Sequence, residues 1–521
     1  MGISIKRIKI LFVGVLAVFL ILCIRLFFIQ IVGLERAETV YSSQYSSELH
    51  GMNYRGDILD RNGVSLVNTE ETYIILLDKI KYDDEAAALL EELGAESISM
   101  DNRRYYGFKT DRHDDEILEI FKSEYGGYVF SSTDRYSLPQ PAAHIIGYCN
   151  RSENTGAFGI EREYNDILVS DGKLSLTVDG VGRILPGYGL SYSSGNDGGS
   201  VQTTLDLDIQ KTAEEALSKY AYNGGAAVIV DADSGGILCS ASYPVFDPDN
   251  PDKAYGSSLV NKAVQTSYPP GSVFKIIVAA AAIEEGIADP EDVFICTGSE
   301  NLFGVEIQCA KKEGHGEITF EEGFARSCNC VFIQLGRELG KDKLLEMANR
   351  FGVGEKVLEI LEEESAGYLA GESQTLGAGI GNLSIGQGET EITCIQAAKI
   401  AGIVACYGKD PGLYLINKGD KNNKEEQIIS VRTALILKKL MCSVVEEGTG
   451  RRAGKDSAGK SGSAQSYING KKVVHGWYIG FFPTDDPKYI VSVIAEDGGG
   501  AAAAVSIFAD IHEGLKNHDL D

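Results

Sequence analysis

The sequence predicts an α+β multidomain protein with one N-terminal transmembrane helix, an elongated β-rich middle domain, and a C-terminal domain with a mainly antiparallel sheet flanked by helices. Residues 10–32 are almost wholly apolar, which is long enough for a membrane span. Strand-like runs near residues 226–241 and 457–497 lie on either side of a mostly helical stretch from about 271 to 446. Strands that enclose helices in this way are typical of such a sheet.

The composition is that of an acidic globular protein. The 521 residues correspond to two to four domains at about 150 residues each. Lysine and arginine number 48 against 75 acidic residues, which gives a net charge of −27. Nucleic-acid binders need a basic face, so we expect no nucleic-acid partner. A hydrophobic share of 44% with 24% charged residues excludes global disorder.

Residues 10–32 are predicted to be an uncleaved transmembrane anchor. The uncharged run Ile10–Ile24 covers only about 22 Å as a helix, short of a hydrocarbon core of about 30 Å. Continuation past Arg25 to Val32 makes the segment long enough. This length, and the lack of an A-x-A site after it, favour an anchor over a cleaved signal peptide. Arg25 either extends toward the outer headgroups or makes a polar contact with another membrane protein.

The charges beside the anchor predict its orientation. Lys6, Arg7 and Lys9 precede it, and positive residues beside a span favour the cytoplasmic side. Residues 1–9 are therefore expected to be a cytoplasmic tail. The protein would be a single-pass protein of the cell membrane, with the bulk of the chain outside the cytoplasm.

The middle domain is predicted to span residues 40–200, and the C-terminal domain residues 201–517. The boundary is placed at the Gly/Ser-rich stretch Ser191–Ser200, because this composition is typical of loops. In the middle domain the turn signal Asn62-Gly63 predicts a hairpin over residues 54–78. Two short acidic amphipathic helices are expected there, over residues 83–95 and 114–124.

The C-terminal domain is expected to begin with a hairpin and to end with three strands and a helix. The turn residues Asp233-Ser234-Gly235-Gly236 separate the two apolar runs of the hairpin at residues 226–241. The later strands are expected near residues 457–464, 474–482 and 489–497, and the final helix over residues 500–516.

Ser272 is the candidate nucleophile. It lies in Tyr268-Pro269-Pro270-Gly271-Ser272-Val273-Phe274-Lys275, where two prolines and a glycine form a rigid approach. The run Ile276–Ile283 that follows is apolar on all sides, which predicts a buried helix. Ser272 would lie at the N-terminus of this helix, where backbone N–H groups favour developing negative charge. Lys275, three residues later, would lie on the same face.

Burial gives Lys275 a chemical role. A free lysine has a pKa near 10.4, and lowering it to about 7 takes about 4 kcal/mol, which burial and a second cation supply. Neutral Lys275 would then take the proton from Ser272. A Ser-x-x-Lys pattern alone arises by chance in a chain of this length, and its position on a buried helix distinguishes this one.

Two other polar segments are candidates for the same site. The first, Ser327-Cys328-Asn329, predicts by itself only a polar turn. The second, Gly459-Lys460-Ser461-Gly462-Ser463, is interpreted as a strand edge that offers Lys460 and two hydroxyls to a carboxylate. Residues 454–461 match a phosphate-loop pattern in full, but that loop needs an apolar strand before it and a helix after it. Neither is expected here.

The cysteines and histidines show no familiar metal-binding spacing. The chain has ten cysteines and seven histidines, without a C-x-x-C or an H-E-x-x-H pattern. Cys328 and Cys330 stand too close in sequence for a zinc pair. Outside the cell, Cys296 and Cys309 either form a disulfide or remain separate buried thiols. We expect no metal and no cofactor.

Three motifs resemble those of penicillin-recognising serine enzymes. They are Ser272-x-x-Lys275, Ser327-x-Asn329 and Lys460-Ser461-Gly462, in this order. Further segments resemble class B penicillin-binding proteins, above all the division and sporulation transpeptidases of Gram-positive bacteria. These are Arg55–Gly63, His144-x-x-Gly147 and Gly159-x-Glu161-x-x-Tyr164 in the pedestal region, and Tyr268–Gly271 and Ser384–Gly388 in the catalytic domain. The chain departs from the family pattern in having Ser461 and Ser463 where threonines are usual.

The resemblance implies a peptidoglycan D,D-transpeptidase. Ser272 would attack the penultimate D-Ala carbonyl of a stem peptide, with Lys275 as general base. The backbone N–H groups of Ser272 and Ser463 would form the oxyanion hole. Ser327, linked to Lys460, would pass a proton to the departing D-Ala.

The remaining site residues would hold the substrate. Asn329 would bond the donor amide and help to position Lys275. Ser461, Gly462 and Ser463 would form the substrate-binding strand, where the hydroxyls and Lys460 hold the terminal carboxylate. An amine of a neighbouring stem would then resolve the ester, and β-lactams would acylate Ser272 as donor mimics.

The resemblance also implies partners. These are stem peptides on lipid-linked glycan strands, β-lactams, a SEDS-type membrane glycosyltransferase, and division or elongation proteins. Two alternatives are open: a D,D-carboxypeptidase or β-lactamase, in which water takes the acyl group, and a non-catalytic scaffold. The middle domain and the anchor favour transpeptidation over hydrolysis, and three intact motifs favour catalysis over a scaffold. A role in septation, elongation or sporulation is left open.

Overall fold

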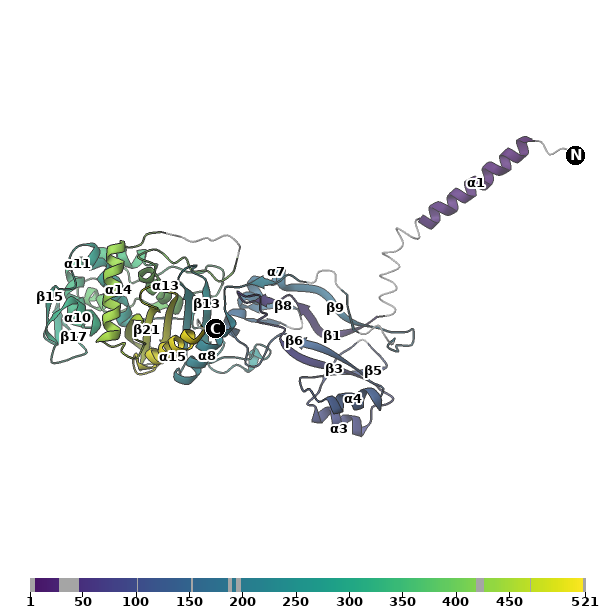
Figure 1. Ribbon diagram of the computed structural model, residues 1–521, viewed down its shortest axis with the longest axis horizontal. Coiled ribbons are helices and arrows are strands. Elements are labelled where there is room, and N and C mark those ends of the chain that lie inside the picture. The colour runs from purple at the N-terminus through teal and green to yellow at the C-terminus, as the bar shows by residue number, and fades with distance from the viewer. Residues whose placement is uncertain are drawn as a thin grey trace. The chain divides into compact units, whose positions relative to one another are not determined.

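The computed structural model describes residues 5–27, 46–100, 102–150, 153–185, 190–193, 198–417, 426–468 and 470–518. The chain divides into two compact units (Figure 1). The first unit comprises Met1–Arg55, Glu70–Thr133 and Ser170–Gly198, and the second comprises Gly56–Thr69, Asp134–Val169 and Gly199–Asp521. The second unit thus includes two segments from within residues 40–200, and the domain limits given above remain predictions.

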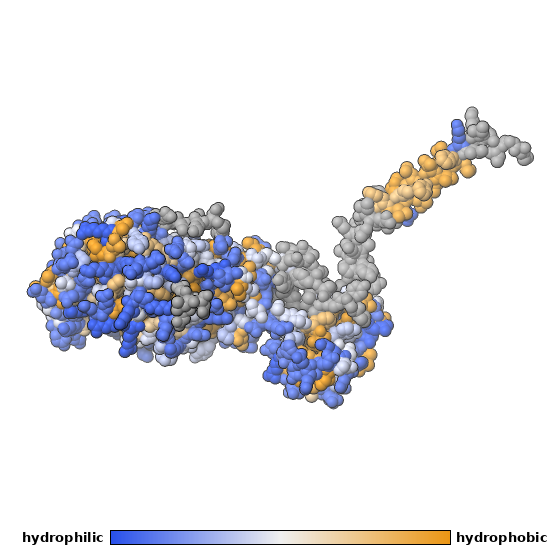
Figure 2. All heavy atoms as spheres, viewed as in Figure 1, coloured by the Kyte–Doolittle hydropathy of each residue, from blue (hydrophilic) through white to orange (hydrophobic). Residues whose placement is uncertain are grey.

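Helix α1 (Ile5–Phe27) has the properties of a membrane anchor. Among the described residues it alone is long and apolar enough to cross a membrane, over Lys9–Phe27. Its apolar side chains are exposed from Ile10 to Phe27 (Figure 2), with Ile10 72% exposed and Phe19 66% exposed. The predicted single span is consistent with this helix, although residues 28–32 lie outside the described part of the chain.

The first unit is built on a four-stranded sheet with two short helices. The strand order is β4 (Glu96–Ile98), β5 (Tyr105–Thr110), β3 (Glu70–Asp78) and β6 (Tyr128–Asp134). Helices α3 (Asp84–Glu92) and α4 (Asp115–Ser123) confirm the two predicted acidic helices. Each begins after an aspartate whose side chain accepts from backbone N–H groups of the first turn, as expected of an N-cap.

The hairpin predicted over residues 54–78 is wrong. Strand β1 (Ser46–Arg55) lies beside β9 (Val169–Thr177), whereas β3 lies between β5 and β6. The turn at Asn62-Gly63 does form, since the backbone N–H of Asp60 donates to the Val64 carbonyl at 2.8 Å. The side chains of Ile74–Leu77 are all buried. Strand β3 is therefore covered on both faces, as a central strand is, and not half-exposed like a hairpin strand.

The second unit contains a five-stranded antiparallel sheet, which confirms the predicted fold class. Its order is β13-β12-β22-β21-β20. Strands β12 (Gly225–Asp231) and β13 (Ile237–Tyr243) form the predicted hairpin. The three predicted C-terminal strands are β20 (Ala458–Ile468), β21 (Lys471–Phe482) and β22 (Tyr489–Ala495). Strand β20 is the edge strand.

Helices cover both faces of this sheet (Figure 1). On one face α8 (Leu207–Tyr220) and α15 (Ala502–His518), the predicted final helix, pack against side chains such as Ile229 and Tyr478. On the other face, residues such as Val228 and Ile479 join a larger core. That core includes α9 (Lys275–Glu284), α11 (Asn329–Arg350), α13 (Cys394–Ala405) and α14 (Val431–Glu446). The alternation follows from the two-residue period of a strand.

The stretch from 271 to 446 is less uniformly helical than predicted. Besides the two-residue strand β19 (Ile392–Thr393), four short strands interrupt it: β15 (Val293–Cys296), β16 (Ser299–Leu302), β17 (Val305–Gln308) and β18 (Gly316–Thr319). Strand β15 pairs with β18, and β16 pairs with β17. Each of these four strands has only four residues, and most of their side chains are partly or fully exposed. They therefore lack the apolar alternation by which strands are recognised.

The segments that resemble a pedestal pack within the second unit. Glu161 is fully buried and pairs with Arg135 at 2.7 Å. His144, also buried, donates from Nε2 to the Ser258 carbonyl at 2.7 Å. Burial lowers the pKa of His144 to about 4. The ion pair lies within residues 134–169, and the His144–Ser258 hydrogen bond ties this segment to the rest of the unit.

Candidate active site

Ser272 lies in a tight turn that leads directly into α9. Residues Gly271–Phe274 form the 3₁₀ turn η3, and Lys275 is the first residue of α9. Ser272 therefore precedes the buried helix by one turn. In a 3₁₀ turn the side chains at positions i and i+3 eclipse one another, a spacing that would set Ser272 and Lys275 on one side. Ser272 is half-buried and Lys275 is fully buried.

Hydrogen bonds from Trp477 in β21 and to Gly386 hold the η3 turn in place, and its backbone lies close to the edge strand β20. Trp477 Nε1 donates to the Pro269 carbonyl at 3.0 Å, and the Gly271 N–H donates to the Gly386 carbonyl at 2.8 Å. Gly271 has a φ of 54°, and a Cβ there would lie 2.7 Å from the Ser463 carbonyl oxygen. Only glycine suits this position, because it permits both the left-handed backbone and the close approach.

Lys275 contacts the second motif directly. Its Nζ lies 2.8 Å from the Ser327 carbonyl oxygen, 3.3 Å from Ser327 Oγ and 2.8 Å from Asn329 Oδ1. Burial lowers its pKa to about 8, which is the direction that a general base requires. Within the described part of the chain, no hydrogen bond joins the Ser272 hydroxyl to Lys275. The Ser272–Lys275 contact of the predicted mechanism is thus not made in this structure.

Lys460 approaches the same serine from the third motif. Its Nζ lies 3.1 Å from Ser327 Oγ and 3.1 Å from the Ser461 carbonyl oxygen. The side chain is fully buried. Burial, and secondarily the charge of Lys275, hold the pKa of Lys460 well below its usual value. Lys275, Ser327, Asn329 and Lys460 therefore form one connected polar cluster.

The substrate-binding residues lie along β20, but their hydroxyls face different surroundings. Ser461 is buried, and its Oγ lies 2.5 Å from Thr449 Oγ1. Ser463 is exposed, so its hydroxyl is the more accessible one. A Cβ on Gly462 would lie 3.2 Å from the Pro270 carbonyl oxygen, which shows how closely β20 approaches η3. The phosphate-loop pattern leads into strand β20 and not into a helix.

Ser327 has a strained backbone. Its φ is 55°, in the left-handed region that non-glycine residues rarely adopt. Strain of this kind is concentrated at functional sites. The turn leads into α11, whose first residue is Asn329. It directs the Ser327 carbonyl and the Asn329 side chain toward the same Lys275 nitrogen.

Sequence reasoning missed two aromatic residues at the site. The rings of Phe332 and Phe324 lie beside the two lysines, with centroids 5.2 Å from Lys275 Nζ and 5.6 Å from Lys460 Nζ. A lone phenylalanine gives no signal in a single sequence, because only the fold brings it to the site. Gln387, in the segment Ser384–Gly388 singled out in the sequence, donates from Nε2 to the Ser463 carbonyl at 3.4 Å.

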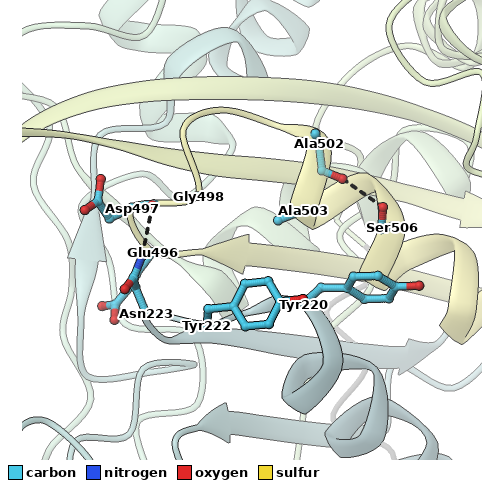
Figure 3. Close-up of a pocket in the computed structure, with 9 residues that line it drawn as sticks. All are labelled: Tyr220, Tyr222, Asn223, Glu496, Asp497, Gly498, Ala502, Ala503 and Ser506. Carbon is cyan, nitrogen blue, oxygen red and sulfur yellow. Dashed lines mark hydrogen bonds between the residues drawn. The ribbon is translucent and has the colours of Figure 1, made fainter.

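A separate pocket lies away from the three motifs (Figure 3). It is lined by Tyr220, Tyr222, Asn223, Glu496, Asp497, Gly498, Ala502, Ala503 and Ser506. Asn223 Nδ2 donates to the Asp497 carbonyl at 3.1 Å across it. Glu496 also accepts from Lys262 at 2.7 Å and from Tyr268 at 2.8 Å. None of the predicted site residues lines this pocket, and Tyr268, which donates to Glu496, belongs to the segment that leads to Ser272.

All ten cysteines are free thiols, including Cys296 and Cys309. Three of them come together with a histidine beside the second motif. The ligand atoms of Cys296, Cys309, His315 and Cys328 all lie within 4.8 Å of one another. Sequence reasoning found no such group, because its members are far apart along the chain.

Comparisons with known proteins agree with this geometry. Residues 225–513 match the penicillin binding protein transpeptidase domain. The chain is 30% identical to stage V sporulation protein D of Bacillus subtilis, over 95% of this chain and 82% of the relative. It is also 30% identical to the peptidoglycan D,D-transpeptidase PbpA of Mycolicibacterium smegmatis, over 71% of this chain and 80% of the relative.

A solved structure shares the fold. Penicillin binding protein 3 from Mycobacterium tuberculosis aligns with a TM-score of 0.65 and 23% identity, over 91% of this chain and 97% of that chain. The chain belongs to the family of penicillin-binding protein transpeptidases, which confirms the resemblance found in its sequence.

Proposed function

We propose that this chain is a membrane-anchored peptidoglycan D,D-transpeptidase that acts through an acyl-enzyme on Ser272. The observation that carries the proposal is the cluster of two buried lysines around Ser327, next to Ser272. Lys275 Nζ and Lys460 Nζ lie 3.3 Å and 3.1 Å from Ser327 Oγ. Two buried cations that share an acceptor favour a neutral amine, and a neutral amine can accept a proton from a serine hydroxyl.

In the acylation step Ser272 Oγ forms a bond to the carbonyl carbon of the penultimate D-Ala. The proton of the hydroxyl passes to Lys275. The tetrahedral oxyanion is held by the backbone N–H groups of Ser272 and Ser463, and the 2.7 Å approach of a Gly271 Cβ to the Ser463 carbonyl supports their proximity. The bond to the terminal D-Ala nitrogen then breaks, and Ser327, bonded to both lysines, passes a proton to that nitrogen.

In the second step an amine of a neighbouring stem attacks the ester. The amine nitrogen bonds to the carbonyl carbon and gives a proton to neutral Lys275. The ester bond to Ser272 Oγ breaks, Oγ takes up a proton from Lys275, and the new amide is the cross-link. The donor peptide is proposed to lie along the exposed edge of β20 as an added strand, with Asn329 at its amide and Ser463 at its terminal carboxylate. Ser461 and Gly462 would form the strand beside the peptide, and Lys460 would offer an N–H donor to the carboxylate. A β-lactam would acylate Ser272 as the donor peptide does in the first step, and the reaction would stop at the ester.

The relatives support this substrate class. One is named a peptidoglycan D,D-transpeptidase, and another a stage V sporulation protein. We propose the same orientation as the charges around the anchor indicate, with residues 1–9 in the cytoplasm. We further propose that residues 40–200 serve as a pedestal and residues 201–517 as the transpeptidase domain. A SEDS-type glycosyltransferase and division or elongation proteins are proposed partners on family grounds.

The proposal is tested by following both products of the reaction. The full chain in detergent is incubated with a stem peptide ending in D-Ala-D-Ala and with an amine acceptor, and free D-Ala and cross-linked peptide are measured by mass spectrometry. We expect both from the wild type and neither from Ser272→Ala. A control, Ser506→Ala in α15, should behave as wild type. Release of D-Ala without cross-linking would indicate a carboxypeptidase, and no release from folded protein would indicate a scaffold.

A further inference from the structure

Three cysteines and one histidine converge behind the second motif. Cys296 Sγ lies 3.4 Å from His315 Nδ1, Cys309 Sγ lies 3.7 Å from the same nitrogen, and Cys309 Sγ lies 3.9 Å from Cys328 Sγ. The three cysteines are 1%, 3% and 0% exposed, in sequence order. His315 is half-buried. Four soft ligand atoms in a mostly buried group are an unusual arrangement for unligated side chains.

These distances are those of a tetrahedral zinc site. Zn–S bonds of about 2.3 Å and Zn–N bonds of about 2.0–2.1 Å place two thiolates about 3.8 Å apart, and a thiolate and an imidazole nitrogen about 3.6 Å apart. Thiolates with one imidazole favour zinc over magnesium or calcium, which take oxygen ligands. We propose that Cys296, Cys309, His315 and Cys328 bind one Zn²⁺ ion.

The short strands missed in the sequence build this zinc site. The pairing of β15 with β18 sets Cys296 opposite Gly316, beside His315. Cys309 follows β17, and its N–H donates to the Gly298 carbonyl at 2.8 Å. Cys328 is the residue before α11.

Two glycines allow the backbone segments around the zinc site to come into close contact. A Cβ on Gly298 would lie 2.0 Å from the Lys312 carbonyl oxygen, and one on Gly314 would lie 2.3 Å from the Cys296 carbonyl oxygen. Both have positive φ values. The loops carrying the ligands are therefore packed against each other as tightly as the backbone permits, which preorganises the ligands.

The zinc site would also support the second motif. Cys328 stands between Ser327 and Asn329, whose oxygen atoms contact Lys275. Asn329 Nδ2 donates to the Gln308 carbonyl at 2.9 Å, next to Cys309. Zinc would thus hold two of the segments that position Lys275. On binding, the three thiols lose their protons to solvent and the imidazole nitrogen binds in its neutral form.

The test is a metal count on the full chain in detergent, purified under reducing conditions and reconstituted with ZnCl₂. We expect about one zinc per chain by elemental mass spectrometry, and thiolate-to-metal charge-transfer bands when Co²⁺ replaces it. The double variant Cys296→Ser, Cys309→Ser should lose the metal, whereas Cys442→Ser, in α14 and away from the cluster, should keep it. Wild-type protein without stoichiometric zinc, or a metal-binding double variant, overturns the proposal. So does a Cys309–Cys328 disulfide, seen as a loss of two hydrogens, that persists under these reducing conditions.

A single substitution at the half-buried ligand serves as a second test, in case the double variant does not fold. His315→Asn removes the half-buried ligand, and we expect its zinc dissociation constant to rise at least about tenfold, since even outer partners of a metal ligand are worth that much. An unchanged constant would contradict the assignment. A second arm measures β-lactam acylation after chelation and after zinc is restored, with slower acylation expected when zinc is removed. The acylation measurement rests on the proposed function, whereas the metal count does not. A failure of the proposed function can therefore be told apart from a failure of the zinc proposal.

Discussion

The buried ammonium groups of Lys275 and Lys460 share one acceptor, the hydroxyl oxygen of Ser327, at 3.3 Å and 3.1 Å. Each lysine is taken out of water, and the charge of Lys275 further disfavours protonation of Lys460. The arrangement thus makes a proton-accepting amine from a residue that is ordinarily a cation.

The first prediction concerns pH. Burial lowers the pKa of Lys275 to about 8, and only its neutral form accepts the Ser272 proton. The second-order rate of acylation by a β-lactam should therefore rise about tenfold per pH unit below about 8 and level off above it. Rapid-quench measurements between pH 6 and 9.5 test this. Lys275→Arg, which stays protonated, should lose the pH-dependent rise and at least about a hundredfold in rate. A flat wild-type profile would contradict the assignment.

The second prediction concerns the approach of η3 to β20. Gly271→Ala and Gly286→Ala both place a side chain at a positive φ, 54° and 68°, at about 1 kcal/mol each. A Cβ at Gly271 also meets the Ser463 carbonyl at 2.7 Å, while Gly286 has open space. Acylation should fall about a hundredfold in Gly271→Ala, because small displacements of reacting groups cost that much. Gly286→Ala should keep the wild-type rate, and equal rates in the two variants would refute the proposed close packing.

The sequence predicted those parts of the fold that have strong local signals. Each of these parts combines a run of apolar residues with residues typical of turns. They are the apolar helix after Lys275, the three C-terminal strands and the turn at residues 233–236. The neighbours of β3 in the sheet could not be predicted, because β5 and β6 are not joined to β3 by the turn that the sequence signals. Local turn residues predict a chain reversal, but burial on both faces decides which strands become neighbours.

The candidate site was predictable as motifs and not as a network. Ser272, Lys275, Ser327, Asn329 and Lys460 were identified by their pattern, and the structure brings the last four into direct contact. Cys296 and Cys309 were considered only as a possible disulfide pair, and their grouping with His315 was not predicted. The spacing matches no common metal motif, and four-residue strands bring the residues together. The hydrogen bond from Trp477 to the Pro269 carbonyl likewise could not be predicted without the fold.

The third prediction separates the two serines of β20. Ser463 is exposed, whereas the Ser461 hydroxyl is bonded to Thr449. Ser463→Ala should lower kcat/KM for the donor peptide about tenfold to a hundredfold, because a hydrogen bond to a charged group is worth about 1.5–3 kcal/mol. Ser461→Ala should have a smaller effect, and Ser463→Thr should retain activity. Steady-state kinetics of D-Ala release decide this, and a larger loss in Ser461→Ala would reverse the roles.

The fourth prediction concerns acid stability. Burial lowers the pKa of His144 to about 4, so the unfolded chain, with a histidine pKa near 6.5, binds a proton first as the pH falls. His144 therefore makes the folded protein lose stability below pH 6.5, by about 2 kcal/mol between pH 7 and pH 5. His144→Gln, which retains an N–H donor for Ser258, should lack this component. Urea unfolding of both proteins at the two pH values measures the difference, and parallel losses would contradict it.

The most direct test of the account is the intact mass of the full chain after incubation with a β-lactam, followed by peptide mapping. We predict one added acyl group per chain, carried by the peptide that contains Ser272, and none on Ser272→Ala protein that retains the wild-type unfolding temperature. An unmodified wild-type chain, or an adduct on any other residue, would contradict the central claim that Ser272 is the nucleophile.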